Sequence, residues 1–147
     1  MNKTLTFSNA IAKMLFNNVA IAGIGDVAGI LGSAVDGVLY LSLHTASPGS
    51  DGLQDVNEAA YTNYVRIAVA RTVSGWVVVG GTASNAAQAL WASAGSAGEE
   101  ITHWGVGTTV SGSTYLLASD RLPGPALVTV VGQSPQADIG ALKWSES

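Results

Sequence analysis

The sequence has no cysteine and few charged residues, and each absence excludes a class of protein. Without cysteine the chain has no disulfide framework, no thiolate nucleophile and no thiolate metal site. Charged residues make up 11% of the 147 residues, well under half of the usual proportion of about a quarter. A surface with so little charge leaves apolar patches uncovered, and such patches mark contacts with other subunits. We therefore expect a component of an assembly.

Basic residues are also scarce. Six Lys and Arg stand against ten Asp and Glu, for a net charge of −4, and they form no basic stripe, so nucleic acid is not an expected partner. No membrane partner is expected either, because five glycines, Asp26 and Asp36 interrupt the apolar run at residues 19–43. Asn and Lys residues interrupt any secretory signal behind Lys3, so we expect synthesis in the cytoplasm.

Short segments with alternating apolar residues make up most of the chain. Two of them, at residues 38–43 and 65–71, flank a polar crossing loop that carries Pro48 and two glycines. Turn residues bound six further candidate strands, at residues 76–79, 82–90, 101–107, 114–117, 126–131 and 139–144. Eight such strands with no helices between them predict an all-β fold, an antiparallel jelly-roll-like β-sandwich over residues 38–147.

The alternation also predicts the core. Ten side chains are expected to face inward: Leu39, Leu41, Leu43, Val65, Ile67, Val69, Trp104, Val106, Leu142 and Trp144. Trp76 and Trp91 are the other two tryptophans, and we expect all four to pack in the core or between sheets rather than to form a ligand platform.

The N-terminal residues predict the one helix, at residues 7–16, with Thr6 or Ser8 as its cap. A helix of roughly ten residues is marginal alone, so its apolar stripe must dock on the same chain or on a neighbouring subunit. We expect residues 1–37, this helix and a Gly/Ala-rich arm, to pack mainly on neighbouring subunits. The expected partner-binding residues are Phe7, Ile11, Met14, Leu15, Ile24 and Ile30.

One glycine pattern resembles a cofactor motif. Gly23-x-Gly25-x-x-Ala28 after an apolar run matches a relaxed dinucleotide-binding fingerprint. That motif needs a βαβ unit and an acidic residue at the end of the second strand, whereas the next strand here ends in His44. A flexible connection is the better interpretation, and we expect no cofactor.

No catalytic or metal-binding pattern emerges. His44 and His103 lack the sequence context of a nucleophile triad, so ordinary hydrogen-bonded histidines are expected. Asp51, Asp55 and Glu58 lack the spacing of an EF-hand, so no metal site is expected. We therefore do not expect an enzyme.

Seven segments occur in an order that resembles a family of small virion proteins of tailed bacteriophages, and the resemblance covers nearly the whole chain. They are the helix at 7–16, LYLSLHTASPG at 39–49, NEAAYTNYVRIAV at 57–69, SNAAQALW at 84–91, EEITHWGVG at 99–107, YLLASDRL at 115–122 and VGQSPQADIGALKW at 131–144. Members look like jelly-roll cement or decoration proteins of the capsid, and relatives are often labelled tail-fibre proteins. The resemblance also implies that Arg66 pairs with Glu58 and pins the crossing loop.

The resemblance implies a structural function. We expect a cement protein on the capsid surface, made in the host cytoplasm, that binds as a dimer or trimer across subunits of the phage major capsid protein. The alternative is a tail-fibre or tail-tip protein that binds a host-surface receptor such as a glycan. Because a fold carries no function by itself, the capsid assignment is an analogy.

Overall fold

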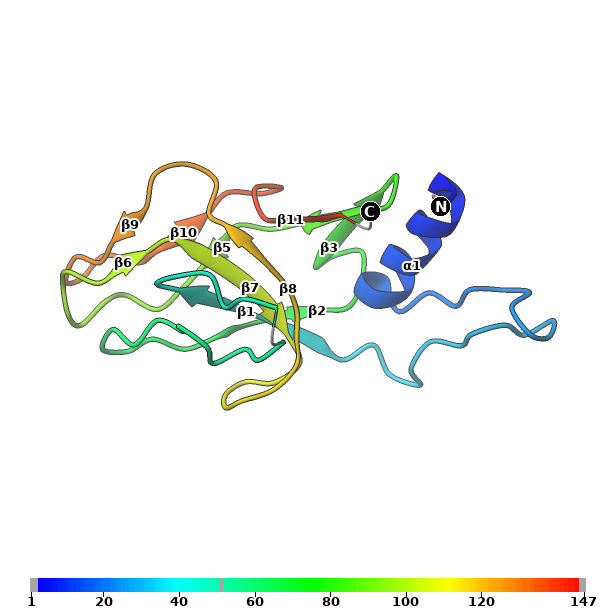
Figure 1. Cartoon of the computed structure of the whole chain (residues 1–147), viewed down its shortest axis with the longest axis horizontal. Coiled ribbons are helices and arrows are strands. Elements are labelled where there is room, and N and C mark those ends of the chain that lie inside the picture. Colours follow the sequence, from blue (N-terminus) through cyan, green and yellow to red (C-terminus); the bar gives the residue numbers. More distant parts are fainter. Residues whose placement is uncertain (1–2, 51, 146–147) are drawn as a thin grey trace. The chain divides into compact units, whose positions relative to one another are not determined.

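The chain forms one helix and eleven short strands over residues 3–50 and 52–145, which are the residues that the computed structural model describes (Figure 1). The helix is α1 (Leu5–Asn17). The strands are β1 (Val38–His44), β2 (Ile67–Ala70), β3 (Trp76–Val79), β4 (Thr82–Asn85), β5 (Ala89–Leu90), β6 (Glu100–Ile101), β7 (His103–Gly107), β8 (Leu116–Arg121), β9 (Leu127–Val128), β10 (Gln136–Ala137) and β11 (Lys143–Ser145). The strand pairs are antiparallel. The predicted class, antiparallel all-β with a short N-terminal helix, is confirmed.

The strands are more numerous than the eight predicted because two predicted segments are each divided. Residues 82–90 hold β4 and β5, and the division follows Asn85, whose side-chain amide donates to the Ala87 carbonyl at 2.7 Å. Residues 101–107 hold parts of β6 and β7, divided at Thr102, whose hydroxyl donates to the Thr45 carbonyl at 2.8 Å. A third addition, β10, is two residues long. The Asn85 bond is local and competes with the strand ladder, whereas the Thr102 hydroxyl binds a residue far away in the sequence.

The described residues fall into two compact units. The first contains residues 3–38, 70–87 and 139–145, with α1, β3, β4 and β11. The second contains residues 39–69 and 88–138, with the four-stranded sheet in the order β2-β1-β7-β8 and the two-stranded sheets β6-β9 and β10-β5. Whether residues 1–37 behave as an arm separate from residues 38–147 stays a prediction.

In the first unit α1 packs against the sheet in the order β11-β4-β3. The Thr4 hydroxyl accepts from the Phe7 amide at 3.3 Å and caps the helix, two residues before the nearer predicted cap. The buried face is Ser8, Ala12 and Phe16, a different face from the predicted stripe. The ring centroid of Phe16 lies 4.8 Å from that of Trp76 and 5.2 Å from that of Trp144. The small side chains at positions 8 and 12 let the helix approach the sheet, so Phe16 reaches the aromatic core.

In the second unit β1 is the inner strand that carries the core. Leu41 lies opposite Val106 and Leu43 opposite Trp104 in its pairing with β7, and all four are buried. Ser42 and His44, which point to the other face of β1, are buried as well. A strand covered on both faces explains why residues 38–44 form the longest strand in the described part of the chain.

The predicted core is largely confirmed. Leu39, Leu142, Trp76 and Trp91 are buried with the residues named above, and the two tryptophans are 0% and 1% exposed. Ile67, Val69 and Trp144 are half-buried. The prediction that Val65 faces the core is wrong, because its side chain is 59% exposed.

The exposure of Val65 has a local cause. It precedes β2, which is an edge strand of its sheet, and the adjacent Arg66 is the buried residue, 6% exposed. Neither Val65 nor Arg66 lies within β2, so the period of two that half-buries Ile67 and Val69 does not extend to Val65.

Within residues 3–50 and 52–145, no helix has the length and apolar character that spanning a membrane requires.

The two phenylalanines provide a matched test of how α1 docks. Phe16→Ala should lower the free energy of unfolding by about 3–5 kcal/mol, because the substitution leaves a cavity between two tryptophans. Phe7 is 39% exposed, so Phe7→Ala should lower the free energy of unfolding by about 1 kcal/mol or less. Urea denaturation followed by tryptophan fluorescence measures both values. Equal losses from the two variants would contradict docking through the Ser8, Ala12 and Phe16 face.

Candidate functional site

The candidate contact site is the loop at residues 18–37, and its base is fixed by Asn18. Asn18 adopts a left-handed conformation, φ 57°, at the C-terminus of α1. Its side-chain oxygen accepts from the Ser33 amide at 2.6 Å, and its NH₂ group donates to the Ser33 carbonyl at 2.9 Å and to Asp36 Oδ1 at 3.0 Å. One asparagine therefore joins the two ends of the loop.

Arg71 strengthens the same base. Its guanidinium donates to the carbonyls of Leu15 and Met14, both at 2.8 Å, in the last turn of α1. It also donates to the Ser33 hydroxyl at 3.2 Å. The last carbonyls of a helix have no partner within the helix, and a cation is favoured there by the helix dipole. Arg71 thus satisfies the end of the helix and holds the loop beside it.

Farther out, Ile21 and Ile30 close the loop with two backbone hydrogen bonds, each 2.9 Å long. At the tip, Asp26 Oδ1 accepts from the amides of Ala28 and Gly29 at 2.8 and 2.9 Å. Gly29 has φ +69°, and a Cβ there would collide with the Ile21 carbonyl, so only glycine fits. Specific backbone geometry therefore defines the tip.

Three apolar side chains of the loop are strongly exposed. Val27 is 96% exposed, Leu31 67% and Val35 76%. Of the predicted partner-binding residues, three are exposed and three half-buried: Phe7, Ile24 and Ile30, then Ile11, Met14 and Leu15. Sequence reasoning missed Val27, Leu31 and Val35, although they recur every four residues through the glycine-rich run.

The same loop contains the dinucleotide-like pattern. Gly23 and Gly25 have φ +77° and +83° and lie in turns. An extended strand does not precede them and a helix does not follow them in the described loop. A pyrophosphate site of this type needs the N-terminus of a helix directly after the glycines, so these residues do not form one.

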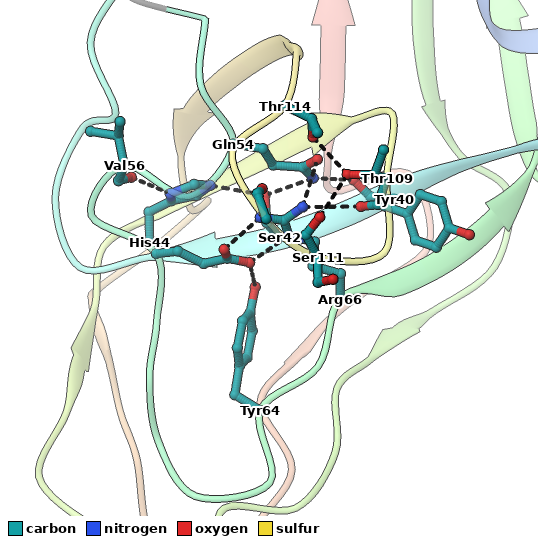
Figure 2. Close-up of polar contacts among 12 residues, drawn as sticks. Tyr40, Ser42, His44, Gln54, Val56, Tyr64, Arg66, Thr109, Ser111 and Thr114 are labelled. Carbon is teal, nitrogen blue, oxygen red and sulfur yellow. Dashed lines mark hydrogen bonds and ion pairs between the residues drawn. The ribbon is translucent and has the colours of Figure 1, made fainter.

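The second unit holds a buried polar network centred on Arg66 (Figure 2). Arg66 Nε and Nη2 donate to Glu58 Oε1 at 2.7 Å and Oε2 at 2.6 Å. The expected ion pair is therefore confirmed as a two-point contact. Tyr64 donates its hydroxyl to Glu58 Oε1 at 2.8 Å and accepts from the Leu43 amide at 3.0 Å. Burial raises the pKa of Tyr64, so the phenol stays a donor.

The remaining donors of Arg66 bind the loop at residues 109–112 and Gln54. Nη1 donates to Gln54 Oε1 at 3.2 Å and to the Thr109 carbonyl at 3.0 Å, while Nη2 donates to the Gly112 carbonyl at 2.9 Å. With the two bonds to Glu58, all five N–H groups of the guanidinium are used. A cavity of about 210 Å³ lies against Arg66 and Glu58, but Arg66 has no donor left for an anionic ligand. Its role is structural.

Gln54 links Arg66 to a buried histidine (Figure 2). Its NH₂ group donates to the Tyr40 carbonyl at 2.8 Å and to Ser42 Oγ at 3.3 Å. Because Ser42 accepts from Gln54, its hydroxyl hydrogen is available to His44 Nε2, 2.9 Å away. His44 Nδ1 then donates to the Val56 carbonyl at 2.9 Å. This direction of donation fixes His44 as the neutral Nδ1–H tautomer.

The histidines are hydrogen-bonded as expected. Ser42 and His44 are adjacent like a catalytic pair, but both are 0% exposed, and a backbone carbonyl, not a carboxylate, orients the imidazole. His103 Nδ1 lies 2.7 Å from the Thr102 hydroxyl. Of the three acids considered for calcium, Asp51 lies outside the described residues and Glu58 binds Arg66. In the described part of the chain no three His, Asp or Glu side chains form a group that could hold a metal ion.

The comparison with protein families decides the assignment. A family model described as "Podophage GP4 fiber I protein gp80" matches residues 3–145. The chain belongs to this fibre protein family. No curated protein matches it. The resemblance to virion proteins of tailed bacteriophages is thus confirmed at the level of a podophage virion component.

The expectation of a capsid cement protein is wrong, since the family is one of fibre proteins. Low surface charge and the absence of catalytic groups motivated that expectation. Both properties fit a structural subunit of a shell or of a fibre, so they do not distinguish the two. The alternative, a tail-fibre component, is the one that the family supports. The expected contact with the major capsid protein depended on the cement assignment and is not carried further.

Loss of the buried arginine tests the network. Arg66→Met should lower the free energy of unfolding by roughly 3–5 kcal/mol, because it leaves the Glu58 carboxylate unpaired. Adding Glu58→Leu should recover part of that loss, giving a negative coupling energy in a double-mutant cycle. Arg121→Met is the control, since Arg121 is exposed on β8 and should cost under about 0.5 kcal/mol. Additive losses in the cycle would contradict the two-point pair.

Acid should destabilise the second unit through His44. Burial lowers the pKa of His44 below its ordinary 6.5, with further lowering by Arg66 and His103 that is opposed by Glu58 and the Val56 carbonyl. The unfolded chain therefore binds a proton before the folded chain does, and stability falls as the pH drops below about 6.5. The slope is at most about 1.4 kcal/mol per pH unit.

His44→Gln is the test variant, and the wild type is the reference. Chemical denaturation between pH 7.5 and pH 5 should show a smaller loss of unfolding free energy for His44→Gln than for the wild type. An unchanged slope in His44→Gln would show that another group titrates.

Proposed function

We propose that the chain is a structural subunit of a podophage fibre and that its loop at residues 18–37 attaches it to neighbouring copies of itself, as a dimer or trimer. The observation that carries the proposal is the exposure of Val27, Leu31 and Val35 on a loop whose base is fixed by Asn18 and Arg71. Family membership supports the fibre, and the loop supports the means of attachment.

Exposed apolar side chains on an ordered loop favour association. Burying one Val or Leu side chain contributes on the order of 1.5–3 kcal/mol. Flexible loops lose part of such a gain because they must be ordered on binding. Here the hydrogen bonds of Asn18, Asp26 and the Ile21–Ile30 pair already order the loop. Most of the apolar gain is therefore available to the contact.

The outer stripe of α1 extends the proposed contact. Phe7 and Leu5 are 39% and 68% exposed on the helix that packs in the same unit. The helix docks on its own sheet through Phe16, so it offers a partner only its outer side. Deleting the whole N-terminal region would thus remove core residues together with contact residues, and a narrower change is needed.

The pairing of Ile21 with Ile30 allows such a change. Two backbone hydrogen bonds join these residues, the geometry that a two-residue hairpin turn also closes. Replacing residues 22–29 by Asn-Gly should keep the fold and shift the melting temperature by less than about 4 °C. Analytical ultracentrifugation should show the wild type as a dimer or trimer and the shortened chain, which loses Val27 but keeps Leu31 and Val35, as a more weakly associated form.

Point variants supply the control. Val27→Ser with Leu31→Ser should weaken self-association, whereas Val73→Ser with Val110→Ser should not, although those valines are 77% and 59% exposed. If the shortened chain stays folded and self-associates as tightly as the wild type, the loop is not the attachment. Equal effects of the two serine pairs would point to unspecific apolar association instead.

A further inference from the structure

A groove of about 460 Å³ lies in the second unit between residues 127–130 and residues 133–136. The two segments are joined by a turn in which the Gln133 amide donates to the Val130 carbonyl at 3.0 Å. The groove is therefore closed at the turn and opens away from it.

The two sides of the groove belong to different small sheets. On one side the Thr129 amide donates to the Glu99 carbonyl at 2.9 Å, beside the β6–β9 pair. On the other side the Pro135 and Gln133 carbonyls accept from Trp91 and Ala94 at 3.0 and 2.8 Å, beside the β10–β5 pair. On each side, these backbone groups therefore form their hydrogen bonds with a segment outside the groove.

Alternation along these segments leaves other peptide groups free. In an antiparallel ladder, successive residues turn their N–H and C=O groups to opposite sides. Val128, Ser134 and Gln136 therefore turn theirs away from β6 and β5 and toward the groove. Apart from the strand pairings, no backbone hydrogen bond within the described residues uses an N–H or C=O group of these three residues. Unpaired donors and acceptors of this kind bind water or a polar ligand.

The chemistry of the lining is neutral. Residues 122–137 contain no Asp, Glu, Lys or Arg. Gln133, Ser134 and Gln136 add side-chain amides and a hydroxyl, while Leu127, Val130 and Pro135 add apolar surface. An ion gains nothing from such a lining. Uncharged hydroxyl groups both donate and accept hydrogen bonds, so a ligand that carries them fits the polar groups of the lining. The apolar parts of such a ligand fit the apolar surface of the lining.

The shape excludes an added strand. A strand bonded to both sides needs neighbours about 4.8 Å away on each side, or roughly 9.6 Å between the two segments. The segments converge to a single hydrogen bond at Val130 and Gln133, so the closed end cannot hold one. The volume lies in the range of about 300–1,000 Å³ typical of small-ligand sites.

We infer that this groove binds a neutral saccharide of one to two sugar units, a receptor contact for the fibre subunit. Amide groups of Gln133 and Gln136 and the free peptide groups at residues 128, 134 and 136 bind its hydroxyls, and Pro135 with Leu127 contacts its apolar face. The tryptophans take no part as a platform, because Trp76 and Trp91 are fully buried. The site rests on the fibre assignment for its role but not on the loop at residues 18–37.

Saturation-transfer NMR on the full chain tests the site, because it detects the NMR signals of the ligand and works for large assemblies. The probes are lactose, maltose, methyl α-mannoside and N-acetylglucosamine, with the charged sugar N-acetylneuraminic acid for comparison. At least one neutral probe should show saturation transfer with a millimolar dissociation constant. Gln133→Ala with Gln136→Ala should weaken it about tenfold or more, since each lost 1.4 kcal/mol is a factor of ten.

Gln88→Ala is the matched control, because Gln88 is an exposed glutamine of the same unit, and it should leave binding unchanged. No transfer to any neutral probe would overturn the inference. So would equal binding by the Gln133/Gln136 variant, or stronger binding of N-acetylneuraminic acid than of the neutral probes. The Asn-Gly loop variant should bind saccharide normally, so failure of the attachment proposal and failure of this one are distinguishable.

Discussion

The second unit depends on one buried ion pair, Arg66 with Glu58. Arg66 is 2% exposed and Glu58 16% in their side chains. A buried pair adds little net free energy once the desolvation of both charges is counted, but an unpaired partner is costly. The consequence is positional. Every carbonyl that Arg66 reaches, at Thr109 and Gly112, must stay where the guanidinium can donate to it.

The network passes this constraint to the strand at the centre of the sheet. Gln54, fixed by Arg66, donates to Tyr40 and Ser42 on β1, and its amide lies where a Cβ at position 107 would be. Only glycine at 107 leaves room for it. Through Ser42 the chain of bonds continues to His44 and ends at the Val56 carbonyl. The buried side chains of His44, Gln54 and Arg66 therefore fix both ends of the crossing loop.

Much of the fold could be predicted from the sequence. Leu39, Leu41 and Leu43 alternate strictly, so the burial of β1 follows from period two. Val65 could not be placed this way, because the burial of Arg66 depends on a carboxylate eight residues earlier. Likewise, the buried face of α1 uses Ser8 and Ala12, which no apolar pattern marks. Where packing needs small side chains or polar partners, periodicity carries no signal.

The candidate sites were harder to predict. The low proportion of charged residues indicated a contact surface, and the loop does expose Val27 and Leu31. A low proportion of charged residues, however, fits a subunit of a shell as well as one of a fibre. The bonds of Asn18 and Arg71 to the loop and to the end of α1 join residues up to 57 positions apart. The groove beside Gln133 depends on two strands of only two residues each. Such features arise from tertiary contacts that local propensity does not encode.

The pair formed by Ile21 and Ile30 has an evolutionary consequence. Everything that holds α1 and its sheet together lies on one side of these two hydrogen bonds, and the exposed tip lies on the other. Insertions, deletions and substitutions in the tip therefore leave the core packing untouched. A fibre protein with such a junction can acquire a new neighbour in the virion by exchanging a few residues, while selection on stability acts elsewhere in the chain.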